Sequence, residues 1–317
     1  MSIKVCCPIC HNGSEMVAPA PNWGEMRRCN TCGLVFANPM ELVTTSEEFY
    51  TKAYNGELSV SDMQHFAKRM QHRKSLLRAH RFFPPQCTVL NIKWITHHLP
   101  KGATILDLGC GPGYFLYAAR RNGYNPIGIE PGQRPATLLK QEGFEVWQGT
   151  LDNYPLDWPQ PDAITCFFVL HHIPDPQGFL STLRKRFPRA TLLISDHHVN
   201  TRSAAGDAEK RTLPPRFLTW WTGQALKQGL VNAGYDPTVL ELPYSIRQAF
   251  TLGIAVALSD TGTTLPAFLN WLFRGEKNST VKSESPTSPH STTFGQRFRR
   301  FTGIPWSLWA VAKPKGQ

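Results

Sequence analysis

Short apolar runs alternate with amphipathic segments from about residue 104 onward. The apolar runs predict seven strands, at 104–109, 125–130, 145–149, 162–169, 190–196, 236–242 and 306–312. The segments between them predict helices at 114–121, 133–142, 176–187 and 219–233. Strands that alternate with helices in this way form a parallel sheet whose faces are covered by the helices. The pattern therefore predicts the α/β fold class.

Upstream of the sheet the pattern is less regular. A helix is expected at 62–83, because Asp62 can cap its N-terminus and Pro84-Pro85 would end it; a second is expected at 89–99. Beside an incomplete apolar stripe, the first helix carries a basic set with no acid between its members: Lys68, Arg69, Arg73, Lys74, Arg78 and Arg81. This set could bind an anion or form an ordinary solvated helix face.

A glycine-rich turn follows the first strand of the predicted sheet. Gly109, Gly111 and Gly113 stand at every second position between the run 104–108 and the helix that begins at Tyr114. Glycine lets the backbone approach a ligand closely, and the helix N-terminus offers unpaired N–H groups. The spacing differs from the G-x-G-x-x-G pattern of nicotinamide-dependent enzymes.

Two more features stand at the ends of neighbouring strands. Glu130 ends the second apolar run, about twenty residues after the glycines, where a carboxylate can accept hydrogen bonds from both hydroxyls of a ribose. The fourth apolar run ends in the polar loop 169–176, Val-Leu-His-His-Ile-Pro-Asp-Pro. Ligands of open α/β sheets bind beyond the carboxyl ends of the strands, so both features fall at the predicted ligand site.

Together these features resemble the class I S-adenosylmethionine-dependent methyltransferases. Asp107-Leu-Gly-Cys-Gly-Pro-Gly is similar to their first motif, Glu130 to their ribose-binding acid, and 169–176 to the loop after their fourth strand. The resemblance covers roughly residues 86 to 245 and the final strand. It implies a Rossmann-like seven-stranded methyltransferase sheet whose last strand runs antiparallel between the fifth and the sixth.

The resemblance also implies a cofactor site for S-adenosylmethionine. Asp107 would bind the amino group, the three glycines would pass against the methionyl and ribose part, and Glu130 would bind the ribose. Thr150 and Leu151 would lie near the adenine, and Phe168 stands at the same rim, at the end of the fourth strand.

Methyl transfer to an oxygen atom requires removal of a proton from the acceptor, and a histidine suits that task at neutral pH. His171 and His172 stand where the acceptor should arrive, and His197 and His198 follow the fifth strand on the same rim. The commonest form of the family's loop has Glu-His at this position. His172 is therefore the first candidate for the general base and His171 the second.

Two C-x2-C pairs near the N-terminus predict a zinc ribbon. Cys7, Cys10, Cys29 and Cys32 can close a tetrahedron of thiolates around Zn²⁺, with Cys6 as a spare residue. His11 and Gly33 follow the two pairs and permit the turn that each requires. A segment this short cannot bury enough apolar area alone, so metal would supply its folding free energy.

Four regions are expected along the chain. They are a zinc ribbon at 1–40, a connector with basic helices at 41–100, a methyltransferase domain at 101–245 plus 304–317, and an insertion at 246–303. The first half of the insertion is apolar, which fits a lid over the acceptor pocket or, alternatively, contact with a membrane surface. Its second half is rich in Ser, Thr and Pro, a composition typical of disorder.

The net charge of +11 favours an anionic partner, such as nucleic acid, phosphorylated lipid or acidic glycan; a basic enzyme without such a partner is the alternative.

The chain shows no apolar signal core at its start and no run long enough to span a membrane, so a cytoplasmic location is expected, with peripheral membrane contact through the insertion as a variant. The sequence indicates no oligomeric state.

The functional prediction is a zinc-containing, S-adenosylmethionine-dependent methyltransferase that modifies a small molecule or a glycan- or lipid-linked intermediate, on oxygen. One alternative is an rRNA or tRNA methyltransferase that grips RNA with its ribbon and basic helix. Another is a non-catalytic cofactor-binding or scaffold protein. The chain lacks an Asn-Pro-Pro-Tyr-like motif after the fourth strand, which disfavours methylation of exocyclic base nitrogens.

Overall fold

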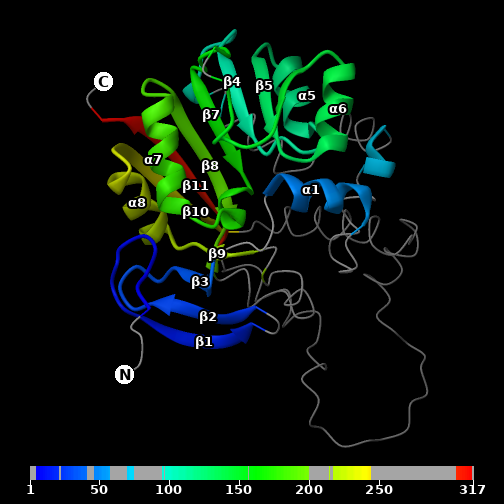
Figure 1. Ribbon diagram of the computed structural model, residues 1–317. Helices are drawn as coiled ribbons and strands as arrows, with labels where there is room; N and C mark the ends of the chain where they lie inside the picture. Colours follow the sequence, from blue (N-terminus) through cyan, green and yellow to red (C-terminus); the bar gives the residue numbers. More distant parts are fainter. Residues whose placement is uncertain are drawn as a thin grey trace, which may run out of the picture. The chain divides into compact units, whose positions relative to one another are not determined.

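The computed structural model describes residues 5–20, 23–40, 46–57, 70–74, 95, 97–155, 157–199, 214, 217–243 and 305–315 (Figure 1). Two sheets are present among these residues, one with four strands and one with seven. The helices are α1 (Ser46–Asn55), α5 (Tyr114–Arg121), α6 (Gln133–Gln141), α7 (Pro176–Arg186), α8 (Gly223–Asn232) and the 3-10 turn η1 (Leu170–His172).

The larger sheet has the strand order that the methyltransferase resemblance implies. In spatial order its strands are β10 (Tyr235–Pro243), β11 (Pro305–Pro314), β8 (Thr191–His197), β7 (Ala163–Phe167), β4 (Thr104–Leu108), β5 (Asn125–Glu130) and β6 (Glu145–Gln148). The strands from β8 to β6 pair in parallel, whereas β11 pairs antiparallel with β8 and lies between it and β10. The Rossmann-like seven-stranded prediction is confirmed, including the antiparallel last strand.

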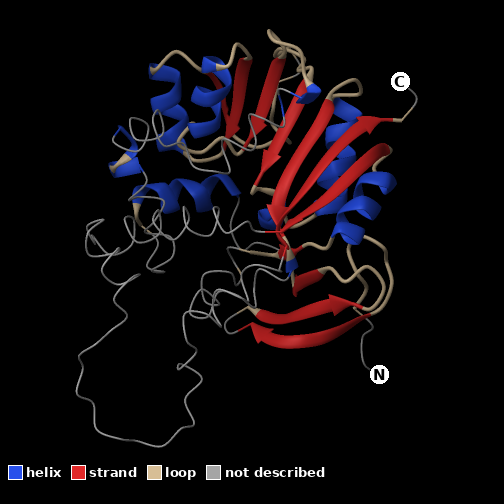
Figure 2. Cartoon of the chain, turned by 180° about the vertical axis from the view of Figure 1, so that it is seen from behind, coloured by secondary structure: helices blue, strands red, loops and turns tan. Residues whose placement is uncertain are grey.

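The central strands of this sheet are apolar at most positions, and successive side chains of a strand point to opposite faces. Both faces of the sheet are therefore apolar. On β4, Leu106 and Leu108 belong to the same buried cluster as Leu183 of α7 and Leu226 of α8. Ile105 points the other way and belongs to a cluster with residues of α5. Figure 2 shows the two groups of helices on either side of the strands.

The smaller sheet includes the predicted ribbon and has four strands. The strands β1 (Ser14–Ala20), β2 (Gly24–Cys29) and β3 (Val35–Asn38) pair antiparallel in chain order. A fourth strand, β9 (Thr219–Trp220), comes from the methyltransferase part of the chain and pairs with β3.

The predicted helix at 219–233 is therefore wrong over its first four residues, because α8 begins at Gly223. Trp220 is buried in one cluster with Met26 and Val35 of the ribbon. Burial of this large side chain against the ribbon outweighs the helical pattern of the local sequence, as tertiary packing commonly does.

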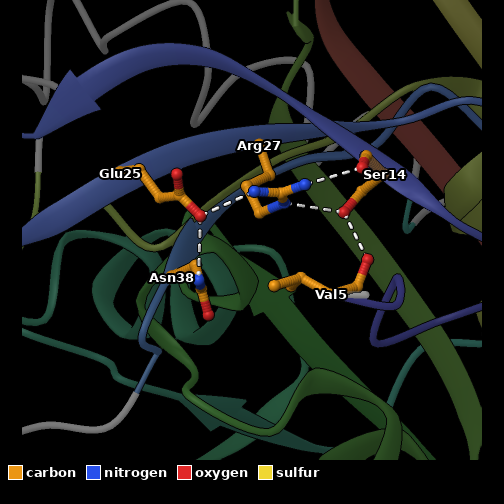
Figure 3. A network of polar contacts seen from close by, with 5 residues as sticks. All are labelled: Val5, Ser14, Glu25, Arg27 and Asn38. Atoms are coloured by element: carbon orange, nitrogen blue, oxygen red, sulfur yellow. Dashed lines mark hydrogen bonds and ion pairs between the residues drawn. The ribbon is translucent and has the colours of Figure 1, made fainter. Parts of the chain in front are cut away.

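A polar network holds the ribbon strands together (Figure 3). Arg27 on β2 donates to Oε1 of Glu25 at 2.6 Å, and to both Oγ and the carbonyl oxygen of Ser14 on β1, at 2.9 and 2.7 Å. Asn38 on β3 donates to the same oxygen of Glu25 at 3.0 Å, and Ser14 Oγ donates to the carbonyl of Val5 at 2.6 Å. Hydrogen bonds from Arg27 and Asn38 hold the pKa of Glu25 below its usual value.

Several predicted regions lie outside the described residues, namely the insertion at 246–303 and most of the helices at 62–83 and 89–99. The four-region division of the chain stays a prediction. Within the described ranges, no helix combines the length and the apolar character that crossing a membrane would require.

We expect Leu106→Ala to lower the free energy of unfolding by roughly 2–5 kcal/mol, because the truncation leaves a cavity in the largest buried cluster. Leu240→Ala is the matched control: Leu240 is 43% exposed on β10 and should change stability by less than about 0.5 kcal/mol. Urea denaturation of both variants measures the difference. Equal stabilities would contradict the placement of β4 at the centre of the sheet.

Candidate functional site

The carboxyl ends of β7, β4, β5 and β6 meet at one edge of the large sheet, because these strands are parallel neighbours. All the residues predicted to bind the cofactor stand on these strands or directly after them. They are Asp107, Gly109, Gly111, Gly113, Glu130, Thr150, Leu151 and Phe168. The topology thus brings together positions that are spread over some sixty residues of sequence.

The glycine turn requires glycine for two separate reasons. Gly109 and Gly113 have φ values of 62° and 84°, which other residues rarely adopt. A Cβ at Gly109 would also lie 2.8 Å from Cγ2 of Val169, and one at Gly113 would overlap the side chain of Leu139. The turn is therefore packed tightly between the loop after β7 and helix α6.

Glu130 connects the turns that follow β4 and β5. Its carboxylate accepts hydrogen bonds from the backbone N–H of Gly111 and of Gly132, each at 2.7 Å. The side chain is fully buried, and burial raises its pKa to about 7 despite these two donors. Two neighbouring backbone turns are thereby held by one acid at the position expected for the ribose.

Asp107 lies on β4 directly before the glycine turn. Thr165 of β7 donates its hydroxyl hydrogen to Oδ1 of Asp107 at 2.7 Å. Burial raises the pKa of Asp107 to about 7, and the charge of Glu130 acts in the same direction. Asp107 and Glu130 are thus two buried carboxyl groups at the same edge of the sheet. A ligand with hydroxyl and ammonium groups could donate hydrogen bonds to them.

The other predicted cofactor residues have distinct local structures. Thr150 donates its N–H to Oδ1 of Asn153 at 2.9 Å, and the neighbouring Leu151 is buried in the core. Phe168 has a φ of 58°, an uncommon value for a residue with a side chain. Its N–H donates to the carbonyl of Ser195 on β8 at 2.8 Å, which fixes the end of β7.

Two residues upstream of the large sheet, Tyr54 and Arg73, lie against the glycine turn. Tyr54 of α1 is buried, and a Cβ at Gly111 would lie 3.1 Å from its hydroxyl oxygen. Arg73 donates to the carbonyl of Pro112 at 2.8 Å and pairs with Glu142 at 2.6 Å. Only 2% of Arg73 is exposed, so this residue does not belong to a solvated or anion-binding helix face.

The predicted acceptor loop forms η1, and its first histidine is tied to a buried acid. Oδ1 of Asp196 lies 2.6 Å from Nδ1 of His171, and Oδ2 accepts the backbone N–H of His171 at 3.1 Å. Both side chains are buried, and burial raises the pKa of Asp196 to about 6. Sequence reasoning missed Asp196, which stands inside β8 without any local pattern to mark it.

His172 differs from its neighbour in being half-buried. Its ring lies 3.9 Å from that of His171 and 5.8 Å from that of Tyr50 on α1, measured between ring centroids. Phe217 completes this group, with its ring 4.0 Å from His171 and 5.1 Å from His197. Three histidines and two aromatic residues from separate parts of the chain therefore form one cluster beside the end of β7.

The four predicted cysteine ligands converge in the ribbon. Their sulfur atoms all lie within 4.8 Å of one another, with separations of 3.6 Å for Cys7–Cys32, 3.3 Å for Cys10–Cys29 and 3.7 Å for Cys10–Cys32. Sulfurs at about 2.3 Å from zinc in a tetrahedron are roughly 3.8 Å apart, so this group fits the ion. Cys6 is exposed and lies outside the group.

The backbone around the cysteines supports thiolates. The N–H of Ile9 points at the sulfur of Cys7, at 3.4 Å. The N–H groups of Thr31 and Cys32 point in the same way at the sulfur of Cys29, each at 3.4 Å. The turns use His11 at a φ of 58° and Gly33 at 73°, as the sequence predicts. The four cysteines would hold a structural Zn²⁺, which would cross-link the two cysteine pairs.

Comparison with known proteins identifies the domain. A family model described as a methyltransferase domain matches residues 67–240, more than half of the chain. The ubiquinone biosynthesis O-methyltransferase of Stutzerimonas stutzeri is 32% identical over 177 residues, which are 47% of this chain and 75% of that protein. The enzyme of the same name from Proteus mirabilis is 25% identical over 43% of this chain and 66% of its own length.

Solved structures with a related arrangement are more distant. A Haloferax volcanii complex of the Trm112 methyltransferase activator with a methyltransferase aligns over 86% of this chain and all of that chain, with 14% identity and a TM-score of 0.47. The plantazolicin methyltransferase BamL aligns over 85% and 97%, with 17% identity and a TM-score of 0.47.

Glu130→Ala should weaken binding of S-adenosylhomocysteine by roughly 1–3 kcal/mol, because the variant loses two hydrogen bonds to the ribose. Glu145→Ala is the matched control, since Glu145 is exposed on the adjacent strand β6. Titration calorimetry on both variants gives the comparison. An unchanged affinity in folded Glu130→Ala would contradict the assignment of the ribose-binding acid.

We expect close to one equivalent of zinc in protein purified without added metal. The Cys29→Ser/Cys32→Ser variant should lose it, because two of four thiolates are gone. Cys6→Ser should keep it, since Cys6 lies outside the group. Metal analysis by mass spectrometry distinguishes these outcomes, and well-folded protein without metal would refute the site.

Proposed function

This chain belongs to the methyltransferase-domain family and is an S-adenosylmethionine-dependent methyltransferase, and we propose that it methylates an oxygen atom of a small molecule or of a glycan- or lipid-linked intermediate. The observation that carries this proposal is the histidine cluster at the end of β7, next to the cofactor edge. An oxygen acceptor must lose a proton during transfer, whereas a sulfonium methyl group needs no further activation. A cluster of imidazoles at the acceptor side meets that need.

His172 is the general base in this proposal. It is half-buried, so an acceptor can reach its ring, whereas His171 is held beneath it by Asp196. Asp196 accepts from Nδ1 of His171 and so fixes the orientation of that ring. The contact between the two rings, at 3.9 Å, then fixes His172. His171 and Asp196 thus position the base.

The rest of the chemistry is alignment and exclusion of water. Asp107, the glycine turn and Glu130 would hold the cofactor, with Thr150, Leu151 and Phe168 along the same edge. Alignment of the acceptor oxygen with the methyl group and sulfur can contribute on the order of 7–11 kcal/mol. Tyr54, which covers the glycine turn, helps to exclude water from the sulfonium.

Two basic residues that could have bound RNA are engaged elsewhere. Arg27 of the ribbon donates to Glu25 and Ser14, and Arg73 pairs with Glu142 and is buried. Phosphate contacts supply most of the affinity of RNA-binding proteins, so these partners disfavour the rRNA or tRNA alternative. The curated relatives, named as O-methyltransferases of ubiquinone biosynthesis, support a small-molecule acceptor.

To test this proposal, purified protein is incubated with methyl-labelled cofactor and, in separate reactions, with one of three cell extracts. The extracts contain small metabolites with lipids, polysaccharide, or total RNA. We expect label in the first or second extract, reduced about 10²–10⁴-fold by His172→Ala, because a general base contributes that much. His97→Ala, at an exposed position, should keep full activity. Label in RNA alone, lost in His172→Ala, would establish the RNA alternative instead.

A further inference from the structure

We propose that the zinc ribbon is the scaffold of the acceptor side of the active site, and that metal in the ribbon controls the histidine cluster without controlling the cofactor site. The connection runs through the segment 217–222, which lies between the ribbon and η1. This inference rests on the proposed function only in calling the histidine cluster the acceptor side.

The first half of the connection joins the ribbon to the segment 217–222. β9 pairs with β3 in antiparallel register, Val35 opposite Trp220 and Phe36 opposite Thr219. The pairing continues beyond the strand, because the N–H of Ala37 donates to the carbonyl of Leu218 at 2.8 Å. The segment is therefore a structural member of the ribbon sheet.

The second half joins the same segment to the histidines. The N–H of Leu218 donates to the carbonyl of His171 at 2.8 Å, so Leu218 is hydrogen-bonded to the ribbon on one side and to η1 on the other. The ring of Phe217 packs against those of His171, His172 and His197. A displacement of 217–222 must therefore move the histidine cluster.

The cysteine pairs themselves are attached to helix α8, which follows the segment. The hydroxyl of Thr222 donates to the carbonyl of the ligand residue Cys32 at 2.6 Å and accepts the N–H of Ala225, which caps α8. At the other end of α8, Asn232 donates to the carbonyl of Ile9, between Cys7 and Cys10, at 2.9 Å. Each cysteine pair is thus fixed by one end of the same helix.

The cofactor site uses other supports. Its glycine turn is held by Glu130, by Arg73 and by packing against α1, against α6 and, at Gly109, against Val169 of the loop after β7. None of these described contacts involves the ribbon or the segment 217–222. A ribbon of this size depends on its metal for folding, so metal loss should release β3 and β9 together while the glycine turn stays intact.

Hydrogen–deuterium exchange with mass spectrometry tests this, on the full chain before and after zinc removal with a chelator. We expect exchange to rise roughly tenfold in 217–222 and 169–173, the change from loss of about one hydrogen bond, but not in 105–113 or 127–132. The affinity for S-adenosylhomocysteine should stay within about threefold. The NMR chemical shifts of the His171 and His172 rings should change with zinc removal, because both rings pack against Phe217.

Thr222→Val provides a second test that keeps all four ligands. It removes the hydrogen bond to Cys32 together with the cap of α8, and should raise exchange in the same two peptides with zinc still bound. Ser181→Ala, an exposed hydroxyl on α7, is the control and should change neither peptide. Neither measurement uses an acceptor, so a failed transfer assay would leave the result unaffected.

Two outcomes would overturn the proposal. Exchange that rises only within 5–40 would make the ribbon an independent module. Exchange that rises equally at the glycine turn, with a parallel loss of affinity for S-adenosylhomocysteine, would make zinc a general support of folding.

Discussion

One buried carboxylate holds the two turns from which the cofactor edge is built. Glu130 accepts from Gly111 after β4 and from Gly132 after β5, so the geometry of both turns depends on it. Burial raises its pKa to about 7, which means that the folded chain binds this proton more tightly than the unfolded chain. Its stabilising contribution is full below the unfolded pKa and is lost as pH rises through about 7. Ribose hydroxyls that donate to Glu130 would favour its ionised form. Ligand binding would therefore lower the pKa that burial of Glu130 raises.

The active site that we propose has two halves with different origins. The cofactor half belongs to the methyltransferase sheet and is covered by Tyr54 from α1. The acceptor half is a cluster of His171, His172 and Phe217, in which Phe217 comes from the segment attached to the ribbon. In the function that we propose, the N-terminal ribbon supports the wall around the chemistry, and this arrangement fits a small acceptor better than a ribbon that binds a distant nucleic acid.

The sequence predicted what depends on local spacing. The glycine turn and each cysteine pair are recognisable because the signal lies within a few residues, and the seven strands follow from apolar runs. Glu130 is recognisable because it ends such a run at the expected distance from the glycines. The missed features join residues far apart: Thr222 contacts Cys32 across 190 positions, and Arg73 meets Glu142 across 69. No local pattern distinguishes Arg73 from its basic neighbours, or shows that Thr219–Trp220 completes another sheet. The zinc ligands, the cofactor-binding residues and the catalytic residues stay predictions.

A crystal structure of the complex with S-adenosylhomocysteine tests the central claim most directly. The account predicts ligand density along Gly109–Gly113, with the carboxylate of Glu130 within hydrogen-bonding distance of both ribose hydroxyls and the sulfur facing the cluster around His172. Ligand bound elsewhere, or a Glu130 carboxylate that contacts only the backbone N–H groups of Gly111 and Gly132 while the ribose is held by other residues, would contradict it.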